Sequence, residues 1–214
     1  MKYAILTLLF AIAVWFSFYT EPLSDKLQRE ALSQYKPDEL VDYHWQHDLD
    51  ALRQQALAPA DFLSRLQADP EALRQQAGHV LGIGSNVYYV LTGEADDLTY
   101  ADYEFRFSAG GIDFVVPTKY IFGNVAREAS GWFDIGDFQN TMDFNAVSAC
   151  INERIRTQVI ADKPQHAADC HHCTFCGAVE VSAQLAPGQA PHTLTLYPYV
   201  FDMAPVSSPR GEAE

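Results

Sequence analysis

Hydrophobic residues in the first third of the chain recur at the spacing of a helix. Between residues 37 and 52, apolar side chains follow three- and four-residue steps: Leu40, Val41, Trp45, Leu49 and Leu52. A second helix start follows at Asp69-Pro70-Glu71, with Asp69 as N-cap, and Gly78 marks its end. We therefore expect a helical region over residues 21–84.

The spacing changes to that of β-strands at residue 85. Val87 to Leu91 form a short apolar run, and Tyr103, Phe105 and Phe107 alternate with polar residues. A Gly-Gly pair after Ala109 predicts a hairpin loop into a third strand, over residues 112–116. Two later strands are expected over residues 174–183 and 193–203, separated by a segment with two prolines and a glycine.

One helix is expected between the third and fourth strands. Its apolar residues are Phe144, Val147, Ile151 and Ile155, and Asp143 or Asn145 is available to cap it. The resulting element order is that of an OB-fold, a five-stranded and partly open barrel. We therefore expect an α+β protein with an OB-like antiparallel barrel over residues 85–204. An open antiparallel sheet with one packed helix has the same element order and stays as the alternative.

The two ends of the chain differ from this body. Lys2 precedes an uncharged run from Tyr3 to Tyr19, which as a helix would be about 25 Å long, at the short end of what crosses a bilayer. The run ends in aromatic residues that suit a membrane interface, so we expect residues 1–20 to be an uncleaved anchor, with a cleaved signal peptide as the alternative. Residues 205–214 are polar with two prolines, and we expect them to be disordered.

The net charge and the N-terminal segment limit which partners and which cell compartment we expect for the protein. The chain has 14 Lys and Arg against 28 Asp and Glu, a formal net charge of −14, which argues against binding to nucleic acid. We expect a single-pass protein of the bacterial inner membrane, with the bulk of the chain in the periplasm. Its expected partners are the membrane and a transporter or other envelope protein.

The stretch from Gly123 to Asn152 carries a recognisable order of residues. A Gly-x-x-x-Arg-acid-Ala block is followed by Asp-Phe-x-Asn and, later, an Asn two turns into the helix. This order resembles the predicted periplasmic lipoproteins catalogued as domain of unknown function 2291. The matching residues are Gly123, Arg127, Glu128, Ala129, Gly131, Asp137, Phe138, Asn140, Val147, Ser148 and Asn152. The resemblance implies a membrane-attached, extracytoplasmic protein of no established activity, often encoded near sugar ABC-transport components, although no lipid-acceptor Cys lies near the N-terminal segment here.

Four polar residues of this stretch are candidate binding residues. Arg127 and Asp137 could form a bidentate ion pair that locks a turn. Asn140 and Asn152 could bind a ligand hydroxyl or satisfy backbone groups of the loop and helix. Holding the loop and binding a ligand are both open for these four residues.

A Cys/His cluster is the second candidate site. Its potential zinc or copper ligands are His166, Cys170, His172, Cys173 and Cys176. In an oxidising compartment the even number of cysteines also predicts disulfides among Cys150, Cys170, Cys173 and Cys176, and free thiols are the third reading.

No recognisable catalytic set accompanies these residues, so we expect a protein that is not an enzyme. The predicted function is that of a membrane-anchored periplasmic accessory or ligand-binding protein, linked to a sugar ABC-transport system. The alternative is a periplasmic metal-handling or thiol-redox protein that uses the Cys/His cluster. No cofactor is expected apart from zinc or copper in that alternative.

Overall fold

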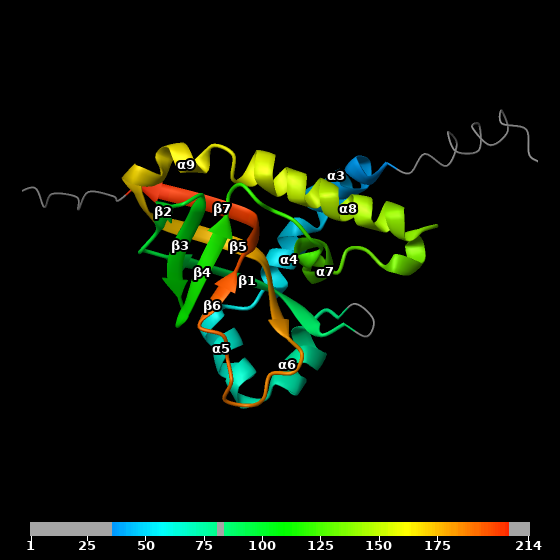
Figure 1. Ribbon diagram of the computed structural model, residues 1–214, viewed down its shortest axis with the longest axis horizontal. Helices are drawn as coiled ribbons and strands as arrows, with labels where there is room; N and C mark the ends of the chain where they lie inside the picture. Colours follow the sequence, from blue (N-terminus) through cyan, green and yellow to red (C-terminus); the bar gives the residue numbers. More distant parts are fainter. Residues whose placement is uncertain (1–35, 81–83, 206–214) are drawn as a thin grey trace, which may run out of the picture. The chain divides into compact units, whose positions relative to one another are not determined.

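The computed structural model describes residues 36–80 and 84–205 (Figure 1). The predicted anchor over residues 1–20 lies outside these residues, as does the tail after residue 205. Within the described ranges, no helix has the length and apolar character needed to cross a membrane. From Pro37 onward the helices and strands belong to one compact unit.

Helices occupy the described chain before the first strand: α3 (Pro37–His47), α4 (Leu49–Gln55), α5 (Pro59–Ala68) and α6 (Pro70–Ala77). The predicted start of α6 is confirmed, because Asp69 Oδ1 accepts a hydrogen bond from the Ala72 amide at 3.0 Å. The apolar stripe over residues 37–52 forms two helices rather than one, with a break at Asp48. Helix α5 was not expected, and it buries Phe62 and Leu66 one turn apart.

The strands form two sheets. The first has the order β1-β5-β7, with β1 (Asn86–Ala95), β5 (Cys170–Ser182) and β7 (Tyr197–Pro205) all antiparallel to their neighbours. The second has the order β2-β3-β4-β6, with β2 (Thr99–Ala101), β3 (Glu104–Ala109), β4 (Ile112–Pro117) and β6 (Thr193–Thr195). In this sheet β6 runs parallel to β4.

This arrangement differs from the expected five-stranded antiparallel barrel. The described strands divide into two sheets, and the predicted strand over residues 193–203 crosses from one to the other. The crossing residue is Leu196, which is fully buried and whose amide donates to the Val115 carbonyl at 2.9 Å. Burial of this side chain between β6 and β7 therefore splits one apolar run into strands of different sheets.

Aromatic side chains fill the space between the two sheets. The Phe175 ring of β5 lies 4.9 Å from the Phe107 ring and 5.3 Å from the Phe114 ring, measured between centroids. Phe201 of β7 lies 5.2 Å from Phe105 in the same way. These five rings are buried, at separations typical of favourable aromatic pairs. The hydrophobic core therefore lies between the inner faces of the two sheets.

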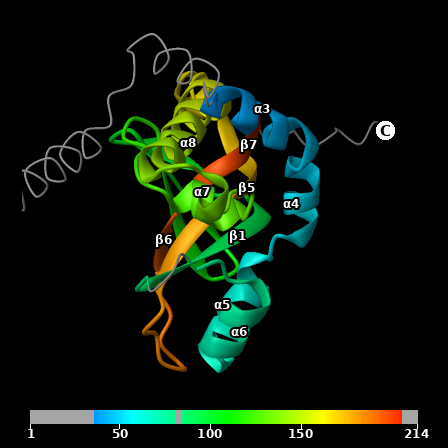
Figure 2. The same cartoon turned by 90° about the vertical axis from the view of Figure 1, so that its right-hand side faces the viewer.

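The helical segments after β4 are α7 (Val125–Ser130), η1 (Ile135–Asp137), α8 (Thr141–Arg154), the π-helical turn η2 (Ile155–Val159), α9 (Lys163–His166) and η3 (Ala167–Asp169). The long helix α8 runs beside α7 and α3, away from α5 and α6 (Figures 1 and 2). Arg154 of α8 forms an ion pair with Asp42 at 2.5 Å and lies over the Trp45 ring, 5.1 Å from its centroid. These contacts hold α8 against α3.

Helix α7 is fixed to the first sheet by a buried hydrogen bond. The Tyr199 hydroxyl of β7 donates to the Ala126 carbonyl at 2.5 Å, and both residues are almost fully buried. Loss of a buried hydrogen bond leaves a polar group without a partner, which costs free energy. Tyr199 therefore sets the position of α7 and of the segment that enters it.

We expect Tyr199→Phe to lower the free energy of unfolding by about 1–2 kcal/mol, because Ala126 would lose its partner in a buried site. Urea denaturation measures this difference. The control is Tyr197→Phe in the same strand, since the half-buried Tyr197 hydroxyl makes no hydrogen bond within the described residues. An equal loss of unfolding free energy in the two variants would contradict the stabilising role of the hydrogen bond from Tyr199 to Ala126.

Candidate functional site

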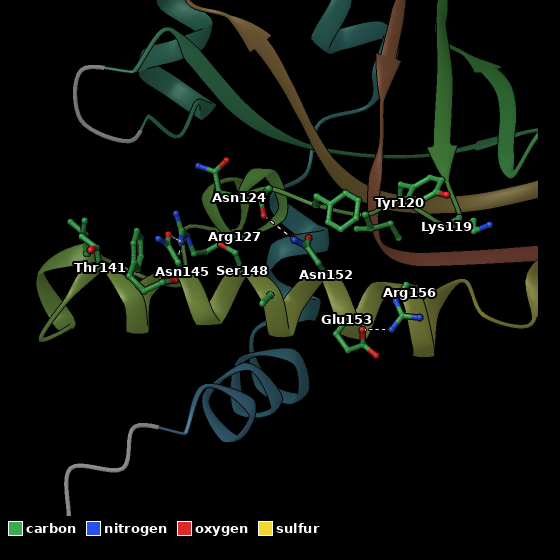
Figure 3. Close-up of a pocket in the computed structure, with 16 residues that line it drawn as sticks. Lys119, Tyr120, Asn124, Arg127, Thr141, Asn145, Ser148, Asn152, Glu153 and Arg156 are labelled. Atoms are coloured by element: carbon green, nitrogen blue, oxygen red, sulfur yellow. Dashed lines mark hydrogen bonds and ion pairs between the residues drawn. The ribbon is translucent and has the colours of Figure 1, made fainter. Parts of the chain in front are cut away.

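A groove of about 940 Å³ runs along α8. Its floor is one face of that helix, and its other wall is the segment from Lys119 to Asn124 with Arg127 of α7 (Figure 3). The lining residues are Lys119, Tyr120, Ile121, Phe122, Gly123, Asn124, Arg127, Ile135, Thr141, Phe144, Asn145, Ser148, Ala149, Asn152, Glu153 and Arg156. Most of them fall within the stretch that carries the family resemblance.

The groove face of α8 is a stripe of polar residues. Thr141, Asn145, Ser148 and Asn152 of α8, with Arg156 of the following turn η2, are spaced at steps of three and four residues, so their side chains lie on one side of the helix. In Figure 3 the labelled members of this stripe rise from α8 toward the opposite wall. The helix thus presents amide, hydroxyl and guanidinium groups to the groove.

The start of α8 is fixed by Asn140, which corrects the expected caps Asp143 and Asn145. Asn140 Oδ1 accepts from the Asp143 amide at 2.9 Å, and Asn140 Nδ2 donates to Asp143 Oδ2 at 2.8 Å. Asn140 is therefore a capping residue outside the groove lining. Asn145 lies one turn further on and is free to face the groove.

Asn152 joins the helix to the opposite wall. Its side-chain Nδ2 donates to the Gly123 carbonyl at 2.8 Å, and only 9% of the residue is exposed. Gly123 has a φ of +88°, a conformation that side chains rarely adopt, although a Cβ there would meet no atom within 4 Å. Backbone conformation rather than space thus requires glycine at this point.

Arg127 is buried, with 3% of its surface exposed, and ties α7 to α8. Its Nε donates to Glu128 Oε1 at 2.9 Å and its Nη1 to the Phe144 carbonyl at 2.8 Å. The guanidinium also lies over the Phe144 ring, 3.6 Å from the centroid. With these partners Arg127 is largely saturated, which favours a positioning role over direct binding.

The expected ion pair between Arg127 and Asp137 is wrong. Asp137 is exposed in η1, and the carboxylate that Arg127 contacts belongs to its neighbour Glu128, which is 9% exposed. Adjacent residues of a helix normally point in different directions, so the sequence offered little reason to pair them. Both side chains reach one buried space because every residue of the short helix α7 is buried.

Ser148 carries an unsatisfied polar group at the groove floor. Its Oγ is buried and has no hydrogen-bond partner within the described chain, and the residue is 8% exposed. A helical serine hydroxyl commonly bonds to the carbonyl four residues earlier, here that of Phe144, but that carbonyl already accepts from Arg127. The hydroxyl therefore lies unsatisfied just below the surface of the groove.

Exposed apolar side chains surround the mouth of the groove. Tyr120 is 65% exposed, Phe122 is 70% exposed and Ile135 is 46% exposed, whereas most large apolar residues of the described chain are buried. Ile121, between the two aromatic residues, is buried. Apolar side chains gathered at one cavity often mark an interaction surface.

Cationic groups lie at one end of the groove. Lys119 and Arg156 both line the groove, toward the end opposite Thr141 (Figure 3). Arg156 pairs with Glu153, whereas Lys119 has no carboxylate partner within the described ranges and lies 4.6 Å from the Tyr103 ring centroid. This end therefore suits a negatively charged group.

The Cys/His cluster does not form the expected metal site. In the described residues, no group of three or more His, Cys, Asp and Glu side chains could hold a metal ion. Cys170, Cys173 and Cys176 are buried along β5, which is paired with β1 on one side and β7 on the other. His172 instead contacts Asp96 at 2.8 Å, and His166 is exposed on α9.

The expected disulfides are not formed either, since all four cysteines are free. Cys150 lies on α8, where its thiol donates to Asp38 Oδ1 at 2.8 Å. Strand β5 holds the other three side chains in separate places, and irregular register at Cys170–His172 and Cys176–Gly177 breaks the simple alternation. All three cysteines of this strand are nevertheless buried.

Burial also makes these thiols unreactive. Desolvation raises the pKa of Cys173 to about 12 and that of Cys176 to about 11. Desolvation and the Asp38 carboxylate raise the pKa of Cys150 to about 12. Because the thiolate is the nucleophile, such thiols react slowly at neutral pH.

We expect four free thiols per chain when the protein is unfolded without reductant, and slow labelling of the native protein at pH 7. The labelling rate should rise with pH, because the thiolate fraction grows as the pH approaches the raised pKa values. Titration with a chromogenic disulfide reagent measures both quantities. A count of two or fewer on unfolding would instead support disulfides.

We expect Arg127→Met to lower the free energy of unfolding by about 3–5 kcal/mol, because Glu128 would be left buried without its cation. The double variant Arg127→Met/Glu128→Leu should recover part of this loss, since it removes both charges. Urea denaturation measures the two values. If Arg127→Met were at least as stable as the double variant, the stabilising role of the ion pair between Arg127 and Glu128 would be contradicted.

The residues brought together in the groove were predicted in part. Arg127 and Asn152 line it, whereas Asp137 and Asn140 do not. Ser148, Asn145 and the exposed aromatic residues were not chosen as candidates. Tyr120, Ile121 and Phe122 form a continuous apolar run, so the sequence contains no alternation that would predict exposure of the two rings.

Comparison with known proteins supports the fold and the resemblance. A crystal structure of an OB-fold protein from Thermotoga maritima matches with a TM-score of 0.65 and 17% identity, over 79% of this chain and 99% of that one. At that identity the likeness shows the fold alone. No curated protein matches significantly. The model of the family described as predicted periplasmic lipoprotein, domain of unknown function 2291, matches residues 8–194, so the chain belongs to this family.

Proposed function

We propose that this protein is a membrane-attached accessory protein of the periplasm, and that it binds a ligand or partner in the groove along α8. We further propose that it works with a sugar ABC-transport system, as the family resemblance implies. The observation that carries the binding role is the buried Ser148 hydroxyl without a partner. A ligand atom that satisfied it would remove a cost of about 1–3 kcal/mol.

The groove favours binding over catalysis. Ser148 is the one buried hydroxyl in its lining, and within the described residues no base lies in hydrogen-bond reach of it. Nucleophilic catalysis by serine requires such a base. The Cys/His alternative gains no support, because its residues are dispersed and its buried thiols are poor nucleophiles.

Site-specific photo-crosslinking in intact cells tests this function. A benzophenone amino acid at Asn145, which is exposed in the groove, should give an adduct that the same group at Gln54 of α4 does not give. Gln54 is also exposed but lies outside the groove, so it controls for chance encounters. The adduct should disappear when Thr141→Trp narrows the groove.

A thermal-shift screen of soluble sugars and of envelope extracts complements the crosslinking. A bound ligand raises the midpoint of unfolding by mass action, and Thr141→Trp should suppress the shift. If neither a groove-specific adduct nor a groove-dependent shift is found, the binding role is wrong.

A further inference from the structure

One wall of the groove is a chain segment whose backbone is unpaired. Residues 119–123 make no backbone–backbone hydrogen bond within the part of the chain that the structure describes. Among the described residues, the one hydrogen bond to this backbone comes from the Asn152 side chain, which donates to the Gly123 carbonyl. Backbone amides and carbonyls without partners are a template for another strand.

Over residues 120–122 exposure alternates as in a β-strand, whereas Lys119 and Gly123 on either side are both exposed. Tyr120 and Phe122 are exposed, and Ile121 between them is 5% exposed. This period of two is that of an extended chain, whose successive side chains point to opposite sides. Residues 120–122 therefore have the side-chain pattern of a strand, and none of the strands in the described ranges pairs with them.

Both walls are elongated. Segment 119–124, which bends at Lys119 and at Gly123, would span at most about 16 Å, at about 3.3 Å per residue. On α8 the distance from Asn145 to Arg156 is also about 16 Å, at 1.5 Å per residue. Figure 3 shows the two running side by side, with Lys119 and Arg156 toward one end and Asn124 and Asn145 toward the other. A ligand that contacts both walls is thus elongated, with a length of about five extended residues.

Each wall presents groups that recognise a peptide. The segment offers backbone donors and acceptors at regular intervals, and α8 offers the side-chain amide of Asn145 and the Ser148 hydroxyl. The exposed Tyr120 and Phe122 rings suit apolar side chains at alternate positions. Lys119 and Arg156 add positive charge at one end, in a chain whose net charge is −14.

We propose that the groove binds an extended peptide segment of a partner protein, which pairs with the backbone of residues 119–123 as an added strand. An acidic residue or the terminal carboxylate of that peptide lies at the end with Lys119 and Arg156. This inference rests on the proposed function, since it names the class of molecule that the groove holds. Strand addition supplies affinity through the backbone, and the two rings supply specificity.

Fluorescence anisotropy with defined peptides tests the proposal. The probes are fluorescein-labelled peptides of about six residues, with apolar residues at alternate positions and one carboxylate at either end. We expect binding to the full chain, weakened about tenfold by Lys119→Glu through the lost charge contact. Arg53→Glu on α4 is the matched control, because Arg53 is exposed and outside the groove, and it should leave affinity unchanged.

Backbone methylation of the peptide separates strand addition from other modes of binding. N-methyl groups at alternate positions should abolish binding in one register and leave it intact in the other, because only every second amide of a strand faces its neighbour. Binding should also slow hydrogen exchange of the amides of residues 120–122. If none of the probes binds, or if methylation has no effect in either register, the peptide inference is wrong. A groove-specific crosslink at Asn145 in the same cells would then still support the binding site itself.

Discussion

The buried guanidinium of Arg127 is the interaction on which the groove depends. It joins Glu128 within α7 to the Phe144 carbonyl and ring of α8, so the two helices that enclose the groove are tied by one side chain. A buried charge is tolerated only when it is paired and hydrogen-bonded, which makes this arrangement costly to disturb. The same contact occupies the carbonyl that would otherwise bond to Ser148, and it thereby leaves a polar group for a ligand.

The two sheets explain why an unpaired segment lies beside α8. Strand β4 ends at Pro117, and the Thr118 amide makes a last bond to the Tyr103 carbonyl before the chain leaves the sheet. The chain then runs to α7, which Tyr199 fixes to the first sheet. Residues 119–123 cross between these two anchors, and Asn152 holds their end against α8. The crossing exposes backbone and aromatic rings together, a combination that suits strand addition.

The cysteine cluster shows how a local pattern can mislead. Three cysteines and two candidate histidines between residues 166 and 176 supply ligands of the right chemistry, yet a metal site also needs them to converge. Here the three cysteines are spread along β5 and buried, whereas His172 of that strand pairs with Asp96 and His166 is exposed on α9. The chemistry of the thiols is suppressed by burial, and the groove in the block with the family resemblance is the better candidate site.

Local signals in the sequence were sufficient for the Asp69 cap, the long helix α8 and strands β1, β3, β4 and β5, because each depends on residues near one another in the chain. The family block was recognisable for the same reason. Sheet closure, the division of the last strand at Leu196 and the partner of Arg127 were decided only by the tertiary structure. These features depend on which side chains are buried together after folding, and neighbours in space such as Gly123 and Asn152 are 29 residues apart in sequence. The groove is likewise formed by tertiary packing. The polar residues of α8 line a cavity only because segment 119–124 lies opposite them.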